Sequence, residues 1–201
     1  GQVMPELLKA LGVTCHKVHC EPHGNFAHNP EPLPAHLTDL SAEVVLQKAS
    51  LGISVDPDVD RLALVCEDGT MFGEEYTLVA CADYVIQKYT EDHPGKSIHT
   101  VSNLSSTRAL KDVTQWYKGS YTAAAVGEVN VVEEMKRTRS IIGGEGNGGV
   151  ILPSLHYGRD ALIGTALFLS LLAEKKINAS ALRDSYPRYH MSKNRVELKE
   201  E

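Results

Sequence analysis

The chain has 201 residues, 42% hydrophobic and 23% charged, a composition typical of folded globular proteins. This length allows one large domain or two small ones. No apolar run reaches the roughly 18–20 residues that a membrane helix needs, and the first residues lack a signal-peptide pattern. The net charge of −6 argues against a nucleic-acid surface, which requires clustered Lys and Arg. We therefore expect a cytoplasmic protein without membrane or nucleic-acid partners.

The cysteine spacing favours free thiols. The four cysteines form no C-x-x-C pair, and three lie in apolar stretches. We expect reduced and mostly buried side chains rather than a disulfide or a zinc site. The cysteines are Cys15, Cys20, Cys66 and Cys81.

The first half is predicted to alternate helices and strands. Apolar residues at helical spacing predict helices at residues 4–11, 37–48 and 74–89. Short apolar runs predict strands at residues 13–20, 52–55 and 61–67. Residues 22–34, rich in Pro, Asn, His and Gly, predict a loop, and Asp68-Gly69 predicts a hairpin turn.

The second half repeats this pattern after a predicted linker at residues 93–96. Strands are expected at residues 98–102, 121–125, 141–143 and 150–152, and helices at residues 106–116, 128–137 and 160–174. The polar stretch at residues 185–201 predicts an exposed connection or an edge strand. The alternation indicates an α/β fold of two tandem domains, residues 1–93 and 96–201, with mixed, largely parallel sheets. An opening helix without a preceding strand suggests a fragment of a longer chain.

Three aspartates, Asp56, Asp58 and Asp60, follow a predicted buried strand at alternate positions. Extended backbone places such residues on one side, where two charges about 4 Å apart repel by roughly 4 kcal/mol at an effective dielectric of 20. Hard oxygen ligands favour Mg²⁺ or Ca²⁺ over Zn²⁺, and we predict one Mg²⁺. Arg61 stands beside them and suits a phosphate, which suggests phosphoryl chemistry.

Two other interpretations of this loop compete with a magnesium site. An EF-hand requires Gly where Arg61 stands, and helices rather than strands on both sides. A solvated acidic turn is the plain alternative; against it, Pro57 stiffens the loop, and the loop is expected at the carboxyl edge of a sheet, where ligands of α/β proteins bind.

Residues 143–149 combine five glycines with Glu145 and Asn147. Glycines allow the backbone to approach a ligand closely, and a carboxylate beside an amide suits a polyhydroxyl ligand such as a sugar. A flexible turn without a ligand is the alternative if this segment is taken alone. Arg159 follows it, with His156 and Asp160, and could reach the same cleft; Asp160 is equally well placed to cap a helix.

In order and spacing, these motifs resemble the α-D-phosphohexomutase family. The stretch DPDVDR resembles that family's D-G-D-G-D-R metal loop, and the glycine-rich stretch GEGNG resembles its G-E-x-S-G sugar loop. Upstream, Gly24-Asn25-Phe26 and Asn29-Pro30-Glu31 resemble a G-x-F…P-N-P-E stretch. The resemblance covers essentially the whole chain, and the metal and sugar motifs together make it specific.

The resemblance implies an isomerase that interconverts hexose or hexosamine 1-phosphates and 6-phosphates through a phosphoserine and a bisphosphorylated sugar. It implies that Asp56, Asp58 and Asp60 hold Mg²⁺ and that Arg61 lies near the reacting phosphate. Gly146 belongs to the sugar loop, where Glu145 and Asn147 would hold sugar hydroxyls, with Asn147 replacing the usual Ser.

Glu128 bears on the choice of sugar. It follows Val126-Gly127, where phosphoglucosamine mutases carry Val-Gly-Asp and mannose or glucose enzymes often carry His. Its carboxylate could pair with the ammonium group of glucosamine. Equally, an acid at this position could only favour a helix dipole. Ser105 also departs from the Lys of the mannose and glucose branch. We therefore prefer a phosphoglucosamine mutase to a phosphomannomutase or phosphoglucomutase.

The chain resembles only the second and third of the family's four domains. It contains neither the T-x-S-H-N-P-like loop of the catalytic phosphoserine nor the R-x-S-G-T phosphate loop. The expected partners are therefore a phosphosugar and the missing first and fourth domains, and this fragment alone should be inactive. A non-catalytic metal- and sugar-binding module is the alternative; a haloacid-dehalogenase-like phosphatase is disfavoured because no Thr follows the aspartates in D-x-D-x-T order.

Overall fold

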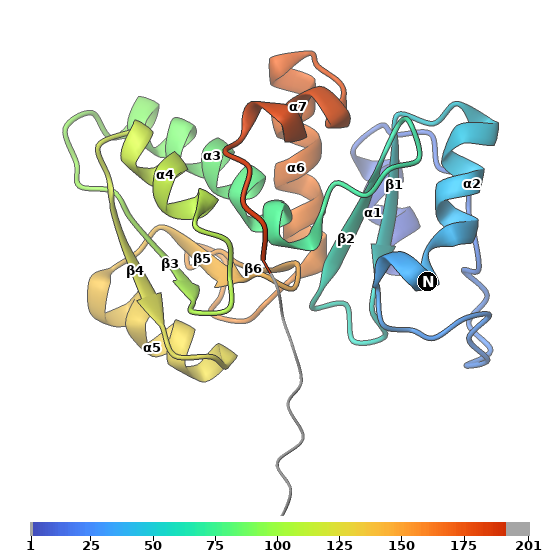
Figure 1. The fold of residues 1–201 in the computed structure, drawn as a ribbon, viewed down its shortest axis with the longest axis horizontal. Coiled ribbons are helices and arrows are strands. Elements are labelled where there is room, and N and C mark those ends of the chain that lie inside the picture. Colours follow the sequence, from blue (N-terminus) through green and yellow to red (C-terminus); the bar gives the residue numbers. More distant parts are fainter. Residues whose placement is uncertain (1, 192–201) are drawn as a thin grey trace, which may run out of the picture.

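The computed structural model describes residues 2–191, which form two unequal sheets. Figure 1 shows a two-stranded sheet on one side, a four-stranded sheet on the other, and long helices between them. The predicted polar segment at residues 185–201 lies partly outside the described residues. None of the described helices combines the length and the apolar character that crossing a membrane requires.

The first half contains a small antiparallel sheet. Two short strands pair in the register Leu51 with Cys66 and Val55 with Leu62. The second of them is entirely buried, in agreement with its continuous apolar sequence. The elements of this half are α1 (Val3–Ala10), η1 (Pro34–His36), α2 (Thr38–Gln47), β1 (Leu51–Val55) and β2 (Leu62–Cys66).

The strand predicted at residues 13–20 is wrong. This segment has no strand geometry and is mostly exposed, with Cys15 on the surface and Cys20 partly exposed. Residues 14–20 make no backbone–backbone hydrogen bond with another described residue. Apolar sequence favours a strand, but a strand forms only where a neighbour takes up its N–H and C=O groups.

The second half carries a complete α/β sheet in the order β4-β3-β5-β6. The strand β3 pairs in parallel with both β4 and β5, and β6 runs antiparallel to β5. The predicted elements are all present here, together with the short helix α7, which the sequence pattern did not predict. They are α3 (Glu74–Asp92), β3 (His99–Asn103), α4 (Ala109–Trp116), β4 (Ser120–Ala124), α5 (Glu128–Thr138), β5 (Ile142–Glu145), β6 (Gly149–Ile151), α6 (Ala161–Lys175) and α7 (Ala179–Ser185).

Helices cover both faces of this sheet. The helices α3 and α4 pack together against one face, and α5 packs against the other. Successive residues of a strand point to opposite faces, so Val150 belongs to the core cluster under α3 and α6 whereas Ile151 packs with Val131 and Met135 of α5. The predicted α/β fold with a mixed, mostly parallel sheet is therefore confirmed for this half.

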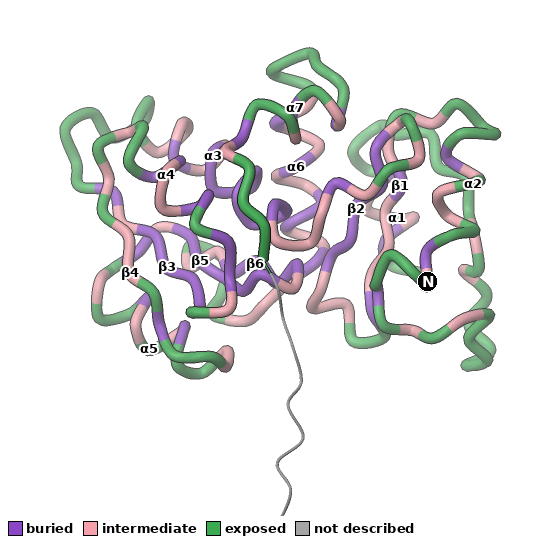
Figure 2. The backbone as a smooth tube through the Cα atoms, in the orientation of Figure 1, coloured by how far each residue is buried: buried purple, intermediate pink, exposed green. Residues whose placement is uncertain are grey.

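The two halves share one core. The rings of Phe72 and Phe168 meet edge to face, with centroids 4.8 Å apart, and both are fully buried. Residues of β2 belong to the same buried cluster as α3 and α6, and Figure 2 shows this buried region running from β2 to β5 and β6. Because α3 packs on α4 and α6, it belongs structurally with the second half, although the predicted boundary at residues 93–96 places it in the first.

The predicted glycine loop is largely a β-hairpin. Residues 143–145 belong to β5 and pair with β6, so only residues 146–148 form the turn. Glycine is required where backbones approach closely: a Cβ on Gly144 would lie 2.0 Å from the carbonyl oxygen of Gly149. Glu145 therefore stands on a rigid strand rather than on a mobile loop.

Candidate functional site

The aspartate loop joins β1 to β2, and Asp56 organises it. Its buried carboxylate Oδ1 accepts hydrogen bonds from the backbone N–H groups of Asp60 (3.1 Å) and Arg61 (3.0 Å). Val59 adopts a left-handed conformation at φ 61°, where its N–H donates to the Asp56 carbonyl. These contacts bend the loop back so that it connects the antiparallel strands.

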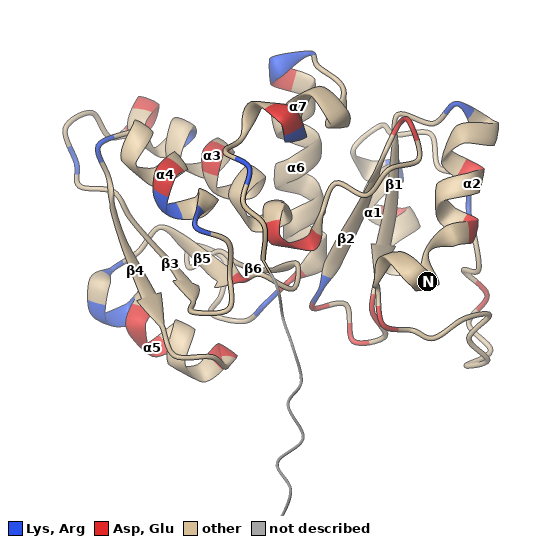
Figure 3. Ribbon diagram, in the orientation of Figure 1, with Lys and Arg blue, Asp and Glu red and all other residues tan. Residues whose placement is uncertain are grey.

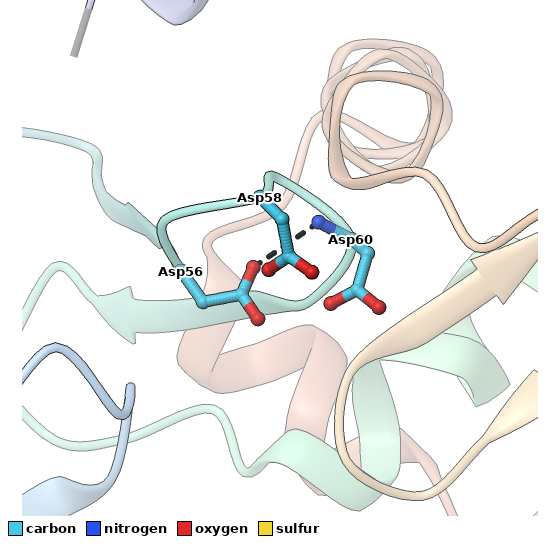
Figure 4. Close-up of side chains that lie close together, drawn as sticks. All are labelled: Asp56, Asp58 and Asp60. Atoms are coloured by element: carbon cyan, nitrogen blue, oxygen red, sulfur yellow. Dashed lines mark hydrogen bonds between the residues drawn. The ribbon is translucent and has the colours of Figure 1, made fainter.

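The three carboxylates fit a divalent cation. Figure 4 shows Asp56, Asp58 and Asp60 directed toward a common space, and one ligand oxygen from each lies within 4.8 Å of the others. Oδ1 of Asp60 is buried and has no hydrogen-bond partner among the described residues. Converging oxygens with an unsatisfied lone pair are the donor set that hard cations prefer, so these residues could hold a metal.

The charges of Asp56 and Asp60 influence each other. Burial raises the pKa of Asp56, but hydrogen bonds from the backbone and guanidinium of Arg61 outweigh it and hold that pKa below its usual value. Burial and the nearby Asp56 carboxyl raise the pKa of Asp60 to about 6, against the opposing charge of Arg159. Arg61 therefore favours the ionised form of Asp56, whereas burial beside another carboxyl disfavours the ionised form of Asp60.

Arg61 connects the aspartate loop to an upstream loop. Its Nε donates to Oδ2 of Asp56 at 2.6 Å, and its Nη1 donates to Oε1 of Glu31 at 2.6 Å. The side chain is about one quarter exposed. The predicted phosphate-binding arginine is thus held by two carboxylates at the protein surface.

Glu145 stands at the carboxyl end of β5 and is nearly buried. Its Oε1 accepts a hydrogen bond from Nδ2 of Asn103 at 2.7 Å, and its Oε2 accepts one from Nη1 of Arg159 at 2.7 Å. The amide oxygen of Asn147 accepts from the backbone N–H of Gly149 at 3.2 Å, which stabilises the hairpin turn. The carboxylate and the amide therefore both have structural partners.

Gly146 cannot carry a side chain without displacing Glu75. A Cβ at this position would lie 2.1 Å from a carboxylate oxygen of Glu75, which itself accepts from the backbone N–H of Thr107 at 2.8 Å. The hairpin turn is thereby packed against the first turn of α3.

Arg159 links the aspartate loop to the glycine hairpin. Its guanidinium donates to Oδ2 of Asp60 and to Glu145, and its Nε lies 3.4 Å from Oε2 of Glu128. Its backbone N–H also donates to Oε1 of Glu128 at 3.0 Å. Nε itself is buried without a hydrogen-bond partner among the described residues. One arginine thus brings the predicted metal, sugar and specificity residues together.

Asp160 and His156, which lie close to this arginine in the sequence, have different roles. Oδ1 of Asp160 accepts from the N–H groups of Leu162 (2.7 Å) and Ile163 (3.0 Å), which makes it the N-cap of α6. His156 is exposed, with Nε2 3.0 Å from Oδ2 of Asp160. The expectation of a helix cap at Asp160 is confirmed.

Three members of this polar network were missed as site residues. Ser106 donates to Oδ1 of Asn103 at 2.6 Å, and Asn103 in turn donates to Glu145. The signal for Asn103 was a polar residue directly after the predicted strand at residues 98–102. Glu31 was named only within a stretch that resembles the family, without a predicted role. Its contact with Arg61 spans 30 positions of sequence, and no local pattern predicts such a contact.

Comparisons with known proteins match this arrangement. The family model "Phosphoglucomutase/phosphomannomutase, alpha/beta/alpha domain II" matches residues 1–69, and that of domain III matches residues 73–189. The matched segments thus meet before α3, upstream of the linker at residues 93–96.

Relatives and solved structures give the same result. A "Probable phosphoglucosamine mutase" of Methanopyrus kandleri is 30% identical over 99% of this chain, and a "Phosphoglucomutase/phosphomannomutase" of Thermococcus kodakarensis is 30% identical over 96%. The chain spans 43% and 41% of their lengths. A phosphoglucomutase/phosphomannomutase family structure from Burkholderia thailandensis superposes with a TM-score of 0.82 at 27% identity, covering 94% of this chain and 40% of that one. The chain therefore belongs to the phosphoglucomutase/phosphomannomutase family and corresponds to its domains II and III.

Proposed function

We propose that this chain is the metal- and sugar-binding part of a Mg²⁺-dependent phosphohexomutase that interconverts 1-phosphates and 6-phosphates of a hexosamine or hexose. The observation that carries the proposal is the bridge from Asp60 through Arg159 to Glu145, which joins the aspartate loop to the glycine hairpin. A metal loop and a polar sugar loop held side by side suit one ligand that carries both a phosphate and hydroxyl groups.

Asp56, Asp58 and Asp60 would hold the Mg²⁺, which when bound supplies positive charge close to a transferring phosphoryl group. Arg61, already aligned by Asp56 and Glu31, would direct its remaining N–H donors toward phosphate oxygens. Burial of Asp56 on the loop's inner side excludes water from part of the site. The chain's own residues thus position the phosphate rather than react with it.

Glu145, Asn147 and the turn at Gly146 would contact the sugar. A carboxylate has about four acceptor positions, so Glu145 can accept from a sugar hydroxyl while retaining Asn103 and Arg159. Asn147 uses its oxygen within the turn, which leaves its NH₂ group for the ligand. Arg159 would hold Glu145 and Glu128 in fixed orientations around the sugar.

Phosphoglucosamine is the preferred substrate because Glu128 places a carboxylate beside the predicted sugar site. This carboxylate also accepts from the backbone N–H of Arg159, so an ammonium group would share it with that donor. The name of the Thermococcus relative favours mannose and glucose phosphates as the second candidate.

The test is turnover by the full-length protein. We expect it to interconvert glucosamine 6-phosphate and glucosamine 1-phosphate faster than the mannose and glucose pairs. We expect Asp58→Asn to abolish activity because it removes a proposed Mg²⁺ ligand. The fold should be retained, since Asp58 is exposed. As a control, Asp92→Asn at the C-terminal end of α3, far from the metal loop, should retain activity. Release of inorganic phosphate without isomerisation would contradict the mutase, and a preference for mannose would contradict the role of Glu128.

The chain of residues 1–201 should bind these ligands without isomerising them. The phosphoserine and the second phosphate loop that the mechanism requires have no counterpart in its sequence. Isothermal titration with glucosamine 6-phosphate in the presence of Mg²⁺, paired with an isomerase assay on the same sample, checks this. Ligand binding by a full-length protein that never isomerises would instead indicate a non-catalytic binding module.

A further inference from the structure

Asn103 and Glu145 end two neighbouring strands of the larger sheet. Asn103 is the last residue of β3, and Glu145 is the last residue of β5. These strands are parallel, and the register that places Ser102 beside Gly144 brings their carboxyl ends together. From β3 the chain continues through α4 to β4 on one side, and from β4 it returns through α5 to β5 on the other side. Open α/β sheets bind ligands at the carboxyl ends of two strands whose connections diverge in this way.

A chain of two hydrogen bonds fixes the side chain of Asn103. The hydroxyl of Ser106 donates to its Oδ1 at 2.6 Å, and its Nδ2 donates to Oε1 of Glu145 at 2.7 Å. An amide carries its acceptor on one atom and its donors on the other, so these two partners allow only one orientation of the amide. All three residues are buried. Asn103 is therefore held so that it donates to Glu145.

Glu75 joins the same two segments at a second point. Its Oε2 accepts a hydrogen bond from the backbone N–H of Thr107, in the loop after β3, at 2.8 Å. The same carboxylate packs against the hairpin turn, where a Cβ on Gly146 would lie 2.1 Å from it. The loop after β3 and the hairpin are thus held together at two points, which limits how far Asn103 can move away from Glu145.

The two donors to Glu145 differ in what else they contact. Arg159 shares its guanidinium among three carboxylates, those of Asp60, Glu145 and Glu128. Nδ2 of Asn103 donates to Glu145 alone among the described residues. Asn103 is also uncharged and lies on a strand with a neighbour on each side. The sheet therefore determines where Asn103 lies relative to Glu145, whereas the position of Arg159 also depends on two other acids.

We propose that Asn103 is a positioning residue for sugar binding and that Ser106 holds it in place. The inference rests on the proposed function, in which Glu145 accepts hydrogen bonds from sugar hydroxyls. Each carboxylate oxygen has about two acceptor positions. Asn103 occupies one on Oε1 and Arg159 occupies one on Oε2, so together they determine the directions from which a hydroxyl can donate. Without Asn103 the carboxylate is free to rotate, and its remaining acceptor positions no longer face the sugar.

Steady-state kinetics of the full-length protein tests this role, with the sugar phosphate that the wild-type protein isomerises fastest. Asn103→Ala should raise the KM about tenfold and change kcat by less than twofold, because a misdirected Glu145 weakens contact with the sugar in the ground state and the transition state alike. A looser fold would instead lower kcat at unchanged KM, because less of the protein would be active. That outcome, or an unchanged KM and kcat, would contradict the proposal.

Ser106 provides a second test that leaves Asn103 and Glu145 in place. Ser106→Ala removes the hydroxyl that fixes the amide and should raise the KM about threefold. Ser106→Thr keeps a hydroxyl at the same position and should keep the KM near the wild-type value. If the threonine variant raised the KM as much as the alanine variant, the hydroxyl would not be what positions Asn103.

Thr100→Val is the matched control on the same strand. The buried hydroxyl of Thr100 forms a hydrogen bond with that of Thr114 in α4 at 2.6 Å, away from the hairpin. Its loss should lower the melting temperature and leave the KM unchanged. An equal rise of KM in Thr100→Val and Ser106→Ala would show that losing any buried hydrogen bond of this region is sufficient, and would overturn the proposal.

A double-mutant cycle assigns the effect to Glu145. In a Glu145→Gln background, Asn103→Ala should raise the KM little further, because the carboxylate that Asn103 orients is already gone. The same fold-change in both backgrounds would overturn the inference. If the wild-type full-length protein isomerises no phosphosugar, the proposed function fails and the inference fails with it. If it isomerises one, and both Asn103→Ala and Ser106→Ala keep the wild-type KM, only the inference fails.

Discussion

The two halves of this chain both alternate helices and strands, but they form sheets of different size, with two strands in the first half and four in the second. In the second half β3 has a neighbour on each side and helices cover both faces of the sheet, so its polar backbone groups are paired. In the first half the same order of elements leaves β1 with one open edge and residues 13–20 without strand geometry. The difference teaches that an apolar segment forms a strand only where a neighbouring strand takes up its backbone N–H and C=O groups.

Several charged side chains meet at the boundary between the halves. Figure 3 shows acidic residues on the loop between β1 and β2, which is the edge of the first half that faces the glycine hairpin. Arg159 crosses from the second half to neutralise Asp60 there. The polar network of Asp60, Arg159 and Glu145 is thus assembled from the loop after β1 and the carboxyl end of β5.

The largest expected effect is the loss of stability when a buried leucine is replaced by alanine, compared between the two halves. Leu171→Ala, in the shared core under α3, should cost about 2–5 kcal/mol because it leaves a closed cavity. Leu8 in α1 borders a groove of about 800 Å³ that is also lined by residues of α2 and β1. Leu8→Ala should lower the free energy of unfolding by about 2 kcal/mol or less, because it enlarges an open groove rather than creating a closed cavity. Urea unfolding monitored by circular dichroism measures both. Equal losses would show that the first half is packed as tightly as the second.

Gly148→Ala tests the backbone contact between the halves. Gly148 has φ +87°, its carbonyl accepts from the N–H of Leu62 at 3.1 Å, and an added Cβ would lie 2.2 Å from the Leu62 carbonyl oxygen. The added methyl group should strain the backbone and push β2 away from the hairpin, which should lower the free energy of unfolding by about 1–3 kcal/mol. Gly24→Ala is the matched control, since its φ is +77° but nothing lies within 4 Å. Indistinguishable unfolding free energies would mean that this contact is not maintained in solution.

Arg159→Met tests the polar contacts that join the two halves at Asp60 and Glu145. It retains much of the side-chain volume but leaves Asp60 and Glu145 without their charged donor, at a cost of about 1–3 kcal/mol. In a double-mutant cycle with Asp60→Asn, the two losses should be less than additive because both variants remove the same contact. Arg188→Met, at an exposed site, serves as the control. Simple additivity would show that the bridge does not couple the halves.

The smallest expected effect is stabilisation by metal. At ten times its Kd, Mg²⁺ should stabilise residues 1–201 by about 1.4 kcal/mol, because it binds only the folded aspartate loop. Asp58→Asn should remove this gain and leave the metal-free stability nearly unchanged, since Asp58 is exposed. Thermal scans with Mg²⁺ and with EDTA measure it. A gain that persists in the Asp58→Asn variant would place the cation elsewhere.

The sequence by itself determined the local features. Apolar periodicity located all the described α-helices but α7 and all the described strands of the second half, since burial of one face imposes the period of each element. It did not predict the short 3₁₀ helix η1. The sequence predicted that the carboxylates of Asp56, Asp58 and Asp60 converge, and their ligand oxygens do lie together. The loop brings them together through a turn with Val59 in a left-handed conformation, not through the extended backbone that their alternate spacing suggested. Asp160 was equally predictable as a helix cap.

Only the tertiary structure decided the features that depend on distant partners. Residues 13–20 lack a strand because pairing needs a neighbour, and α3 joined the second half because its apolar face packs on α4 and α6. The glycine segment became a hairpin through its pairing with β6. Arg159 meets Asp60 across 99 positions of sequence, and no local pattern specifies such a contact, because its energy comes from the packing that brings two loops together.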